Sequence, residues 1–274
     1  MFDPKTGKYP YTEYTDGHYI VITKTRGYIF DEKYAYVDQS KKFRFRQTCA
    51  RFLLNLIFFP VTRIRFGLKI VGKKNLKKNK KILKQGVVSI SNHVNFWDYI
   101  CVMKAIRPFR SCILARGENV NDKSGNLVRL VGGIPIPDKG IRAKATFIRS
   151  VDNLIKNGGW LHVFPEGSMW EYYAPIRPFK TGAANFAVRN NKPIMPLGFS
   201  YREPGWIRKH IFKQIACLNI NIGNPIYPNH ELSKIDQILD LTKRSHEAVC
   251  ELVGFEDGKN IYPPIFENNK RIDY

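Results

Sequence analysis

Two side chains that could act together as a general base, His93 and Asp98, lie five residues apart. They follow a short apolar run at residues 87–90, and the carboxyl end of a strand is where α/β folds usually build their sites. If a helix begins just after His93, the Asp98 carboxylate can fold back and accept the second N–H of the imidazole. Such a pair needs no serine or cysteine nucleophile. The spacing alone is a weak signal, because six histidines could produce it by chance and an isolated histidine is more often structural.

A second polar cluster follows the apolar run at residues 161–164 and reads Pro-Glu-Gly-Ser at 165–168. Glu166 could orient a hydroxyl or a neighbouring cation. Lys180, together with the N–H groups at the start of a helix expected at 183–189, would suit a phosphate. The alternative is a turn that ends a strand, in which Pro-Glu-Gly is only turn chemistry.

Four segments in a particular order carry a family resemblance. They are Asn-His-x4-Asp at 92–98, Gly-Gly-Ile-Pro-Ile-Pro-Asp-Lys at 132–139, Phe-Pro-Glu-Gly at 164–167 and Lys-Pro-Ile-Met-Pro at 192–196. The chain thereby resembles the lysophospholipid acyltransferase family, the relatives of 1-acylglycerol-3-phosphate acyltransferase. Four blocks in the right order within roughly residues 67–225 make a chance match improbable.

The resemblance implies roles for particular residues. His93 would deprotonate the acceptor hydroxyl, which attacks an acyl thioester directly, and Asp98 would assist His93 without a covalent acyl-enzyme. The donor would be an acyl thioester of coenzyme A or acyl carrier protein, with no bound cofactor and no metal. The acceptor would be a lysophospholipid, in phospholipid biosynthesis. The expected substrate-binding residues are Asn92, Gly133, Lys139, Glu166, Gly167, Ser168, Arg177 and Lys180.

The sequence departs from the family pattern in two blocks. The second block usually ends in arginine, and Lys139 keeps that charge without bidentate phosphate geometry. The third block usually continues Gly-Thr-Arg, whereas residues 167–169 read Gly-Ser-Met, so the arginine is missing. This loss argues against a simple lysophosphatidate acceptor. Our hypothesis is that Arg177 or Lys180 supplies the missing charge.

The elements that must position these residues form an α/β pattern. Apolar runs at 87–90, 111–115, 161–164, 194–199 and 215–222 predict strands, and helices are expected at 144–156, 183–189 and 232–253. We therefore predict a mixed, largely parallel sheet covered by helices. The catalytic domain would span residues 70–230, followed by a C-terminal helix and tail at 231–274. Alternating runs at 18–23, 28–30 and 34–37 predict a strand-rich extension over residues 1–40.

Residues 41–69 have the composition of a membrane-docking segment. A helix is expected up to residue 59, where Pro60 should end or kink it. Arg44, Thr48, Arg51 and Asn55 form one narrow polar stripe on this otherwise apolar helix. Lysines and arginines flank it, with seven lysines from residue 73 to 84. This composition favours docking on anionic lipid over packing on the core. The apolar run at 52–61 is too short to span a bilayer.

The overall charge favours an anionic partner. The net charge is +22, which suits an anionic membrane surface, a phosphorylated substrate or acyl carrier protein. Nucleic acid is not expected, because the lysine cluster lacks interleaved aromatic residues on a recognisable binding fold. Five scattered cysteines and the absence of a secretory leader predict the cytoplasmic face of the cell membrane, with peripheral or monotopic attachment. The alternatives are a catalytically idle membrane-surface lipid-binding protein with the same fold and an acyltransferase for a different acceptor lipid.

Overall fold

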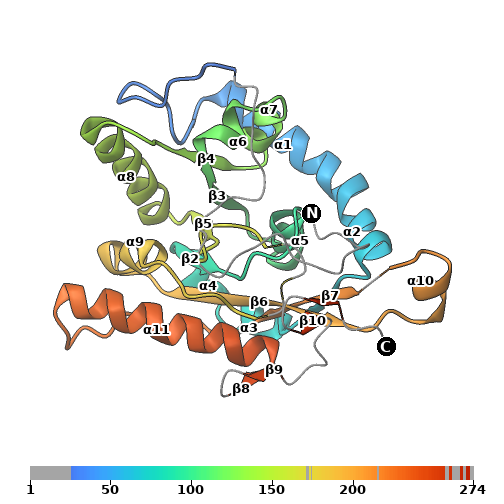
Figure 1. The fold of residues 1–274 in the computed structure, drawn as a ribbon. Coiled ribbons are helices and arrows are strands. Elements are labelled where there is room, and N and C mark those ends of the chain that lie inside the picture. The colour runs from blue at the N-terminus through green and yellow to red at the C-terminus, as the bar shows by residue number, and fades with distance from the viewer. Residues whose placement is uncertain are drawn as a thin grey trace.

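A seven-stranded sheet lies at the centre of the computed structural model, which describes residues 26–170, 173, 175–214, 216–256, 259–260, 266–267 and 270–271 (Figure 1). The strand order is β1-β7-β6-β2-β5-β3-β4. The five neighbours from β6 to β4 run parallel, whereas β7 is antiparallel to β6 and parallel to β1. The predicted mixed, largely parallel sheet is confirmed. Its strands are β1 (Lys69–Val71), β2 (Val87–Ile90), β3 (Ser111–Arg116), β4 (Gly133–Ile136), β5 (Trp160–Val163), β6 (Ile194–Arg202) and β7 (Cys217–Ile222).

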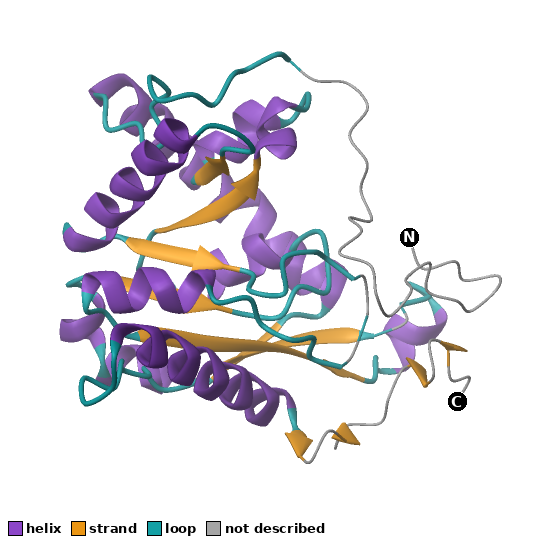
Figure 2. Ribbon diagram, turned by 60° about the vertical axis from the view of Figure 1, so that its left-hand side comes forward, coloured by secondary structure: helices purple, strands orange, loops and turns teal. Residues whose placement is uncertain are grey.

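Helices cover both faces of the sheet (Figure 2). In chain order the helices of the described residues are α1 (Lys41–Leu53), a π-helical turn η1 (Leu54–Phe58), α2 (Phe59–Phe66), α3 (Lys73–Lys78), α4 (Lys80–Leu83), α5 (Asp98–Ala105), α6 (Gly117–Asn121), α7 (Gly125–Leu130), α8 (Ile141–Lys156), α9 (Gly182–Asn190), α10 (Trp206–His210) and α11 (Lys234–Val253). Side chains of α8, α9 and α11 share one hydrophobic cluster with the sheet, and those of α2 to α5 share the other. Two short strand pairs follow: β8 (Phe255–Glu256) with β9 (Lys259–Asn260), and β10 (Phe266–Glu267) with β11 (Lys270–Arg271).

The layer formed by α8, α9 and α11 consists of helices whose sequences predict one buried face. In α8 the buried positions include Ala143, Phe147, Val151 and Ile155, which recur every fourth residue and form one apolar stripe. Burying each large side chain of such a stripe stabilises the fold by about 1.5–3 kcal/mol. Helix α11 begins where the Ser233 side chain accepts the N–H of Asp236 and ends before a left-handed glycine.

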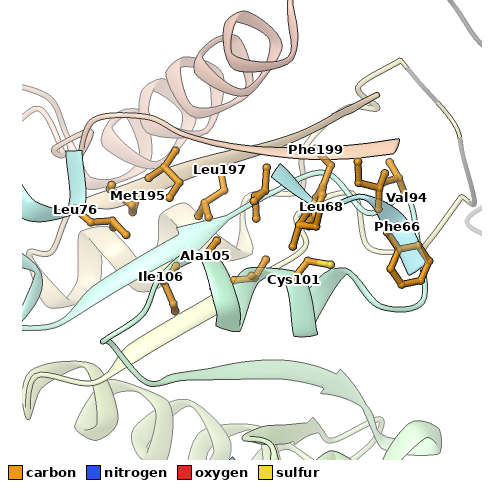
Figure 3. Packing of buried hydrophobic residues seen from close by; sticks show 14 of the residues in the cluster. Phe66, Leu68, Leu76, Val94, Cys101, Ala105, Ile106, Met195, Leu197 and Phe199 are labelled. Carbon is orange, nitrogen blue, oxygen red and sulfur yellow. The ribbon is translucent and has the colours of Figure 1, made fainter. Parts of the chain in front are cut away.

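On the other face of the sheet, in the layer formed by α2 to α5, helix α5 packs directly against β6. Met195, Leu197 and Phe199 of β6 face this helix, and Cys101 and Ala105 of α5 pack against them (Figure 3). All five side chains are buried. Because α5 begins at Asp98, this packing fixes the position of that carboxylate relative to the end of β2.

The N-terminal extension differs from its prediction. Residues 26–40 form turns and coil without a strand, so the strands predicted at 28–30 and 34–37 are wrong, and the run at 18–23 lies outside the described residues. The aromatic residues fill a core position instead. Tyr36 is fully buried, donates its hydroxyl to the Phe30 carbonyl at 2.8 Å and packs edge to face against Phe147 at 5.6 Å. The alternation that suggested strands arises from this packing.

The helical segment continues past Pro60, so of the two predicted effects of this proline the helix does not end there. The π-helical turn at Leu54–Phe58 ends two residues before this proline, which lies in the first turn of α2, where a missing N–H is tolerated. The segment ends at Gly67 with a left-handed φ of 57°. Large apolar side chains are exposed along it: Phe45, Phe52, Leu53, Leu56, Ile57 and Ile64. In the part of the chain that the structure describes, no helix combines the length and apolar character that crossing a membrane requires.

Candidate active site

The two residues predicted as a general-base pair come together at the carboxyl end of β2. The His93 Nδ1 lies 3.0 Å from the Asp98 Oδ2. The same carboxylate oxygen accepts the backbone N–H groups of Val94 at 2.6 Å and Asn95 at 2.8 Å. One carboxylate therefore orients the imidazole and also holds the turn that carries it.

Burial and ring stacking define the surroundings of this pair. Asp98 is completely buried, which raises the pKa of its carboxyl, while the hydrogen bonds from His93 and the two backbone N–H groups act to lower it. The His93 ring stacks on Phe164 with a centroid distance of 3.9 Å and an interplanar angle of 5°. The His93 side chain remains 23% exposed. With Nδ1 bonded to the carboxylate, Nε2 is the nitrogen left for proton transfer.

Glu166 joins the third block to the first. Its Oε2 accepts the backbone N–H of His93 at 3.2 Å and the Arg177 Nη2 at 2.7 Å, and its Oε1 accepts the Arg177 backbone N–H at 3.2 Å. Burial raises the pKa of Glu166, and the Arg177 guanidinium acts in the opposite direction. The carboxylate thus braces the loop that holds the His93 imidazole.

Arg177 is locked into this loop, although it was predicted to bind the acceptor. Its Nη1 donates to the Ser168 Oγ at 2.7 Å, and its Nη2 also donates to the Ser168 carbonyl. The guanidinium carbon lies 4.6 Å from the centroid of the Trp170 ring. With these contacts and the Glu166 pair, Arg177 and Ser168 fix the shape of the turn instead of presenting polar groups to a substrate.

Lys180 and Gly167 lie against each other beside this turn. Gly167 has a φ of 81°, and a Cβ placed there would stand 3.1 Å from the Lys180 Nζ. The Lys180 backbone N–H donates to the Pro165 carbonyl at 2.8 Å, and helix α9 begins two residues later at Gly182. The Lys180 side chain is exposed. The predicted convergence of a cation with a helix N-terminus is therefore present at this turn.

Three other residues that were predicted to bind substrate lie outside the turn that carries Glu166 and Lys180. The Asn92 side chain is buried, donates to the Phe199 carbonyl at 3.0 Å and accepts the Phe199 N–H at 2.7 Å, so it clamps β2 to β6. Gly133 is buried within β4, and a Cβ there would lie 2.6 Å from a Val128 methyl, so its role is close packing. Lys139 is exposed beyond β4, three strands from β2, which corresponds to about 14 Å across the sheet.

A buried histidine beneath the site was not anticipated. His162 lies on β5, and its two ring nitrogens are 2.9 Å from the Ser89 Oγ and 3.3 Å from the Ser91 Oγ. Burial lowers the pKa of His162 to about 3, so it is neutral. The signal for this network was a polar residue in each of two adjacent apolar strands, at 89 and 162.

Comparisons with known proteins bear on the family and the fold. Residues 67–200 match the family model described as Acyltransferase. A segment of 75 residues is 33% identical to N-acylphosphatidylethanolamine synthase of Arabidopsis thaliana and covers 27% of this chain but only 24% of that protein. The fold is similar to the crystal structure of the 1-acyl-sn-glycerophosphate (LPA) acyltransferase PlsC from Thermotoga maritima. That likeness has a TM-score of 0.50 and 17% identity, over 82% of this chain and 87% of the other.

Proposed function

Because this chain belongs to the glycerolipid acyltransferase family, we propose that it transfers a fatty acyl group from an acyl thioester to the hydroxyl of a lysophospholipid. The observation that carries the proposal is the pair of His93 Nδ1 and Asp98 Oδ2 at 3.0 Å. The pair lies at the carboxyl end of a parallel strand, where α/β folds bind their ligands. The turn that carries Glu166 braces the pair, and the same turn lies beside Lys180 and the N-terminus of α9.

The pair supports a direct transfer without an acyl-enzyme. The His93 Nε2 accepts the proton of the acceptor hydroxyl, and that oxygen attacks the thioester carbonyl carbon. When the tetrahedral intermediate collapses, the carbon–sulfur bond breaks and the leaving thiolate accepts the proton that Nε2 took from the acceptor hydroxyl. The products are an ester and a thiol. Asp98 keeps the proton of the neutral imidazole on Nδ1 and stabilises the imidazolium that forms during the reaction.

The cations of the site suggest how an anionic acceptor is bound. We assign the acceptor phosphate to the Lys180 ammonium and the N-terminus of α9, which lie beside the turn that carries Glu166. Lys139 stands farther along the same edge of the sheet and suits a second anionic group of a substrate. The donor is an acyl thioester of coenzyme A or acyl carrier protein, and both carriers are anionic and compatible with a net charge of +22.

Membrane docking through residues 41–69 is part of the same proposal. Arg51, on the polar stripe of α1, points inward and donates to the Ser111 carbonyl at 2.9 Å. The exposed surface of the segment carries large apolar side chains such as Phe52, Leu56 and Ile64. Basic residues flank this surface, which favours anionic lipid. We propose peripheral or monotopic attachment at the cytoplasmic face of the cell membrane.

The test is transfer of a labelled acyl group from coenzyme A and acyl carrier protein thioesters to a panel of lysophospholipids. We expect at least one acceptor to be acylated, and we expect His93→Ala to abolish that transfer while liposome binding is retained. Failure of the folded, liposome-bound wild type to acylate any acceptor would favour the catalytically idle lipid-binding protein. Transfer that persists in His93→Ala would disprove the assignment of the base.

A further inference from the structure

The connection between β6 and β7 exposes a cluster of large apolar side chains. Its described part includes helix α10 and residues 211–214. The exposed fractions are 69% for Trp206, 58% for Ile207, 63% for Ile211 and 62% for Phe212. Apolar clusters of this kind on a soluble surface usually mark an interaction site. We call these four residues the α10 apolar tip.

The sheet register places this tip on the active-site edge. Strand β6 runs parallel to β2, with Pro196 opposite Ile90. The Asn92 side chain binds both backbone groups of Phe199, so β6 is at the level of the His93 loop near that residue. The strand then continues three residues to Arg202, which is about 10 Å farther out. The α10 apolar tip therefore projects beyond the catalytic histidine on the same edge of the sheet.

Hydrogen bonds join the tip to the end of α2. Arg208 donates to the Ile64 carbonyl at 2.6 Å and to the Arg63 carbonyl at 3.0 Å, and it also donates to the Gln214 Oε1 at 3.0 Å. Arg202 donates to the Gly67 carbonyl. These bonds cap the carboxyl end of α2 and hold the connection in a defined position. The tip is thus continuous with the exposed apolar surface of residues 41–66.

The charges around the tip are mainly positive. Lys209 is exposed between Ile207 and Ile211, Lys213 is exposed directly after Phe212, and Arg63 and Arg65 are exposed on the adjoining turn of α2. Glu203 is the single acidic residue in the sequence between β6 and β7. Aromatic and aliphatic side chains ringed by lysine and arginine suit the boundary between the headgroups and acyl chains of an anionic bilayer.

We propose that the α10 apolar tip inserts into an anionic bilayer as a second docking element beside residues 41–66. The proposal rests on the proposed function, because its occupant is argued from a lipid-processing site on the same edge. Two elements fix the orientation of the protein on the membrane, whereas one helix leaves it free to rotate about the helix axis. With both inserted, the open edge of the sheet faces the lipid surface, and an acceptor can enter without leaving the bilayer.

Trp206 supplies a direct probe of insertion. Trp160 and Trp170 are buried, so quenching of tryptophan fluorescence by lipids brominated on their acyl chains reports mainly on Trp206 and on the partly exposed Trp97. We expect such lipids, in vesicles of phosphatidylglycerol and phosphatidylcholine, to quench the wild type strongly and Trp206→Phe weakly. Equal quenching of the two proteins would overturn the proposal.

A paired variant tests the contribution to binding. We expect Trp206→Ser combined with Phe212→Ser to weaken flotation with the same vesicles by roughly tenfold or more. The matched control is Ile235→Ser combined with Leu239→Ser, which removes two equally exposed apolar side chains from α11 on the other layer and should leave flotation unchanged. Circular dichroism and thermal unfolding confirm that both variants fold.

The outcomes separate this proposal from the acyl-transfer reaction. Quenching of Trp206 without acyl transfer supports the tip as a docking element while the reaction fails. Acyl transfer to micellar lysophospholipid without quenching supports the reaction and overturns the tip. A tip that instead binds protein predicts that the paired serine variant loses self-association in solution but floats like the wild type, which would also overturn the proposal.

Discussion

The separation of roles between Arg177 and Lys180 gives the sharpest test of the site. Both are cations near the third block, and both could replace the arginine that the family carries there. The structure buries Arg177 against Glu166, with the two side chains 13% and 2% exposed, and leaves Lys180 exposed beside Gly167. We therefore expect replacement of each residue by methionine to damage a different property of the enzyme.

The magnitudes follow from these environments. Arg177→Met leaves the Glu166 carboxylate buried without its cation, and breaking such a buried pair lowers the free energy of unfolding by about 3–5 kcal/mol. Lys180→Met removes the charge of an exposed side chain, where an ion pair contributes at most about 1 kcal/mol, so that free energy should fall by no more than about 1 kcal/mol. It also removes a charge-assisted hydrogen bond to the acceptor phosphate, so KM for the acceptor should rise about tenfold or more.

Urea unfolding and steady-state kinetics with one phosphate-bearing lysolipid measure both properties. Arg177→Met combined with Glu166→Gln serves as a control, because it removes both charges and should recover part of the lost stability. The reasoning is refuted if Arg177→Met is as stable as the wild type and raises only KM. It is also refuted if Lys180→Met leaves KM for the acceptor unchanged.

Three further predictions concern residues of the same region. Asp98→Asn should lower kcat by roughly a thousandfold without abolishing folding, because the amide no longer fixes the imidazole tautomer; activity within tenfold of wild type would contradict this role. Gly167→Ala should lower the free energy of unfolding by about 1–2 kcal/mol, since its φ of 81° is left-handed, and should raise KM for the acceptor by displacing Lys180; thermal unfolding and kinetics check both effects. The pKa of His162 falls from 6.5 to about 3 on folding, so the unfolded chain binds this proton first as the pH drops. Wild type should therefore lose about 2 kcal/mol of stability from this group between pH 8 and pH 5, and His162→Gln should lack that part of the loss in urea titrations at the two pH values.

Much of the site could be predicted because its signals are local in the sequence. His93 and Asp98 are close along the chain, so a strand end followed by one helical turn is enough to bring them together. The apolar runs that predicted β2, β3, β5 and β6 are short and fully or largely buried, as expected for a parallel sheet. The apolar runs therefore predicted five of the seven strands of the central sheet and the edge on which the base lies, whereas β1 and β4 were not predicted.

Other features depend on contacts between distant segments, which one sequence does not reveal. Asn92 looked like part of a substrate site, but its amide matches the backbone of Phe199, more than 100 positions later. The alternation that suggested a strand near Tyr36 reflects packing against α8, and the proline in α2 is tolerated because a π-helical turn precedes it. In each case a local pattern was correct about residue type but did not determine the partner.

The position of Arg177 explains how the third block can lack the arginine that its family carries at residue 169. Glu166 accepts the backbone N–H of His93 and holds the loop, and because burial raises the pKa of its carboxyl, a neighbouring cation is needed to favour the ionised form. Arg177 meets that requirement from eleven residues away in the sequence, and in doing so it engages Ser168 as well. With these contacts made, the Arg177 guanidinium cannot also bind a phosphate through two parallel hydrogen bonds. Charge that supports the loop is thus carried by Arg177, and we propose that the exposed, single-point charge of Lys180 recognises the acceptor.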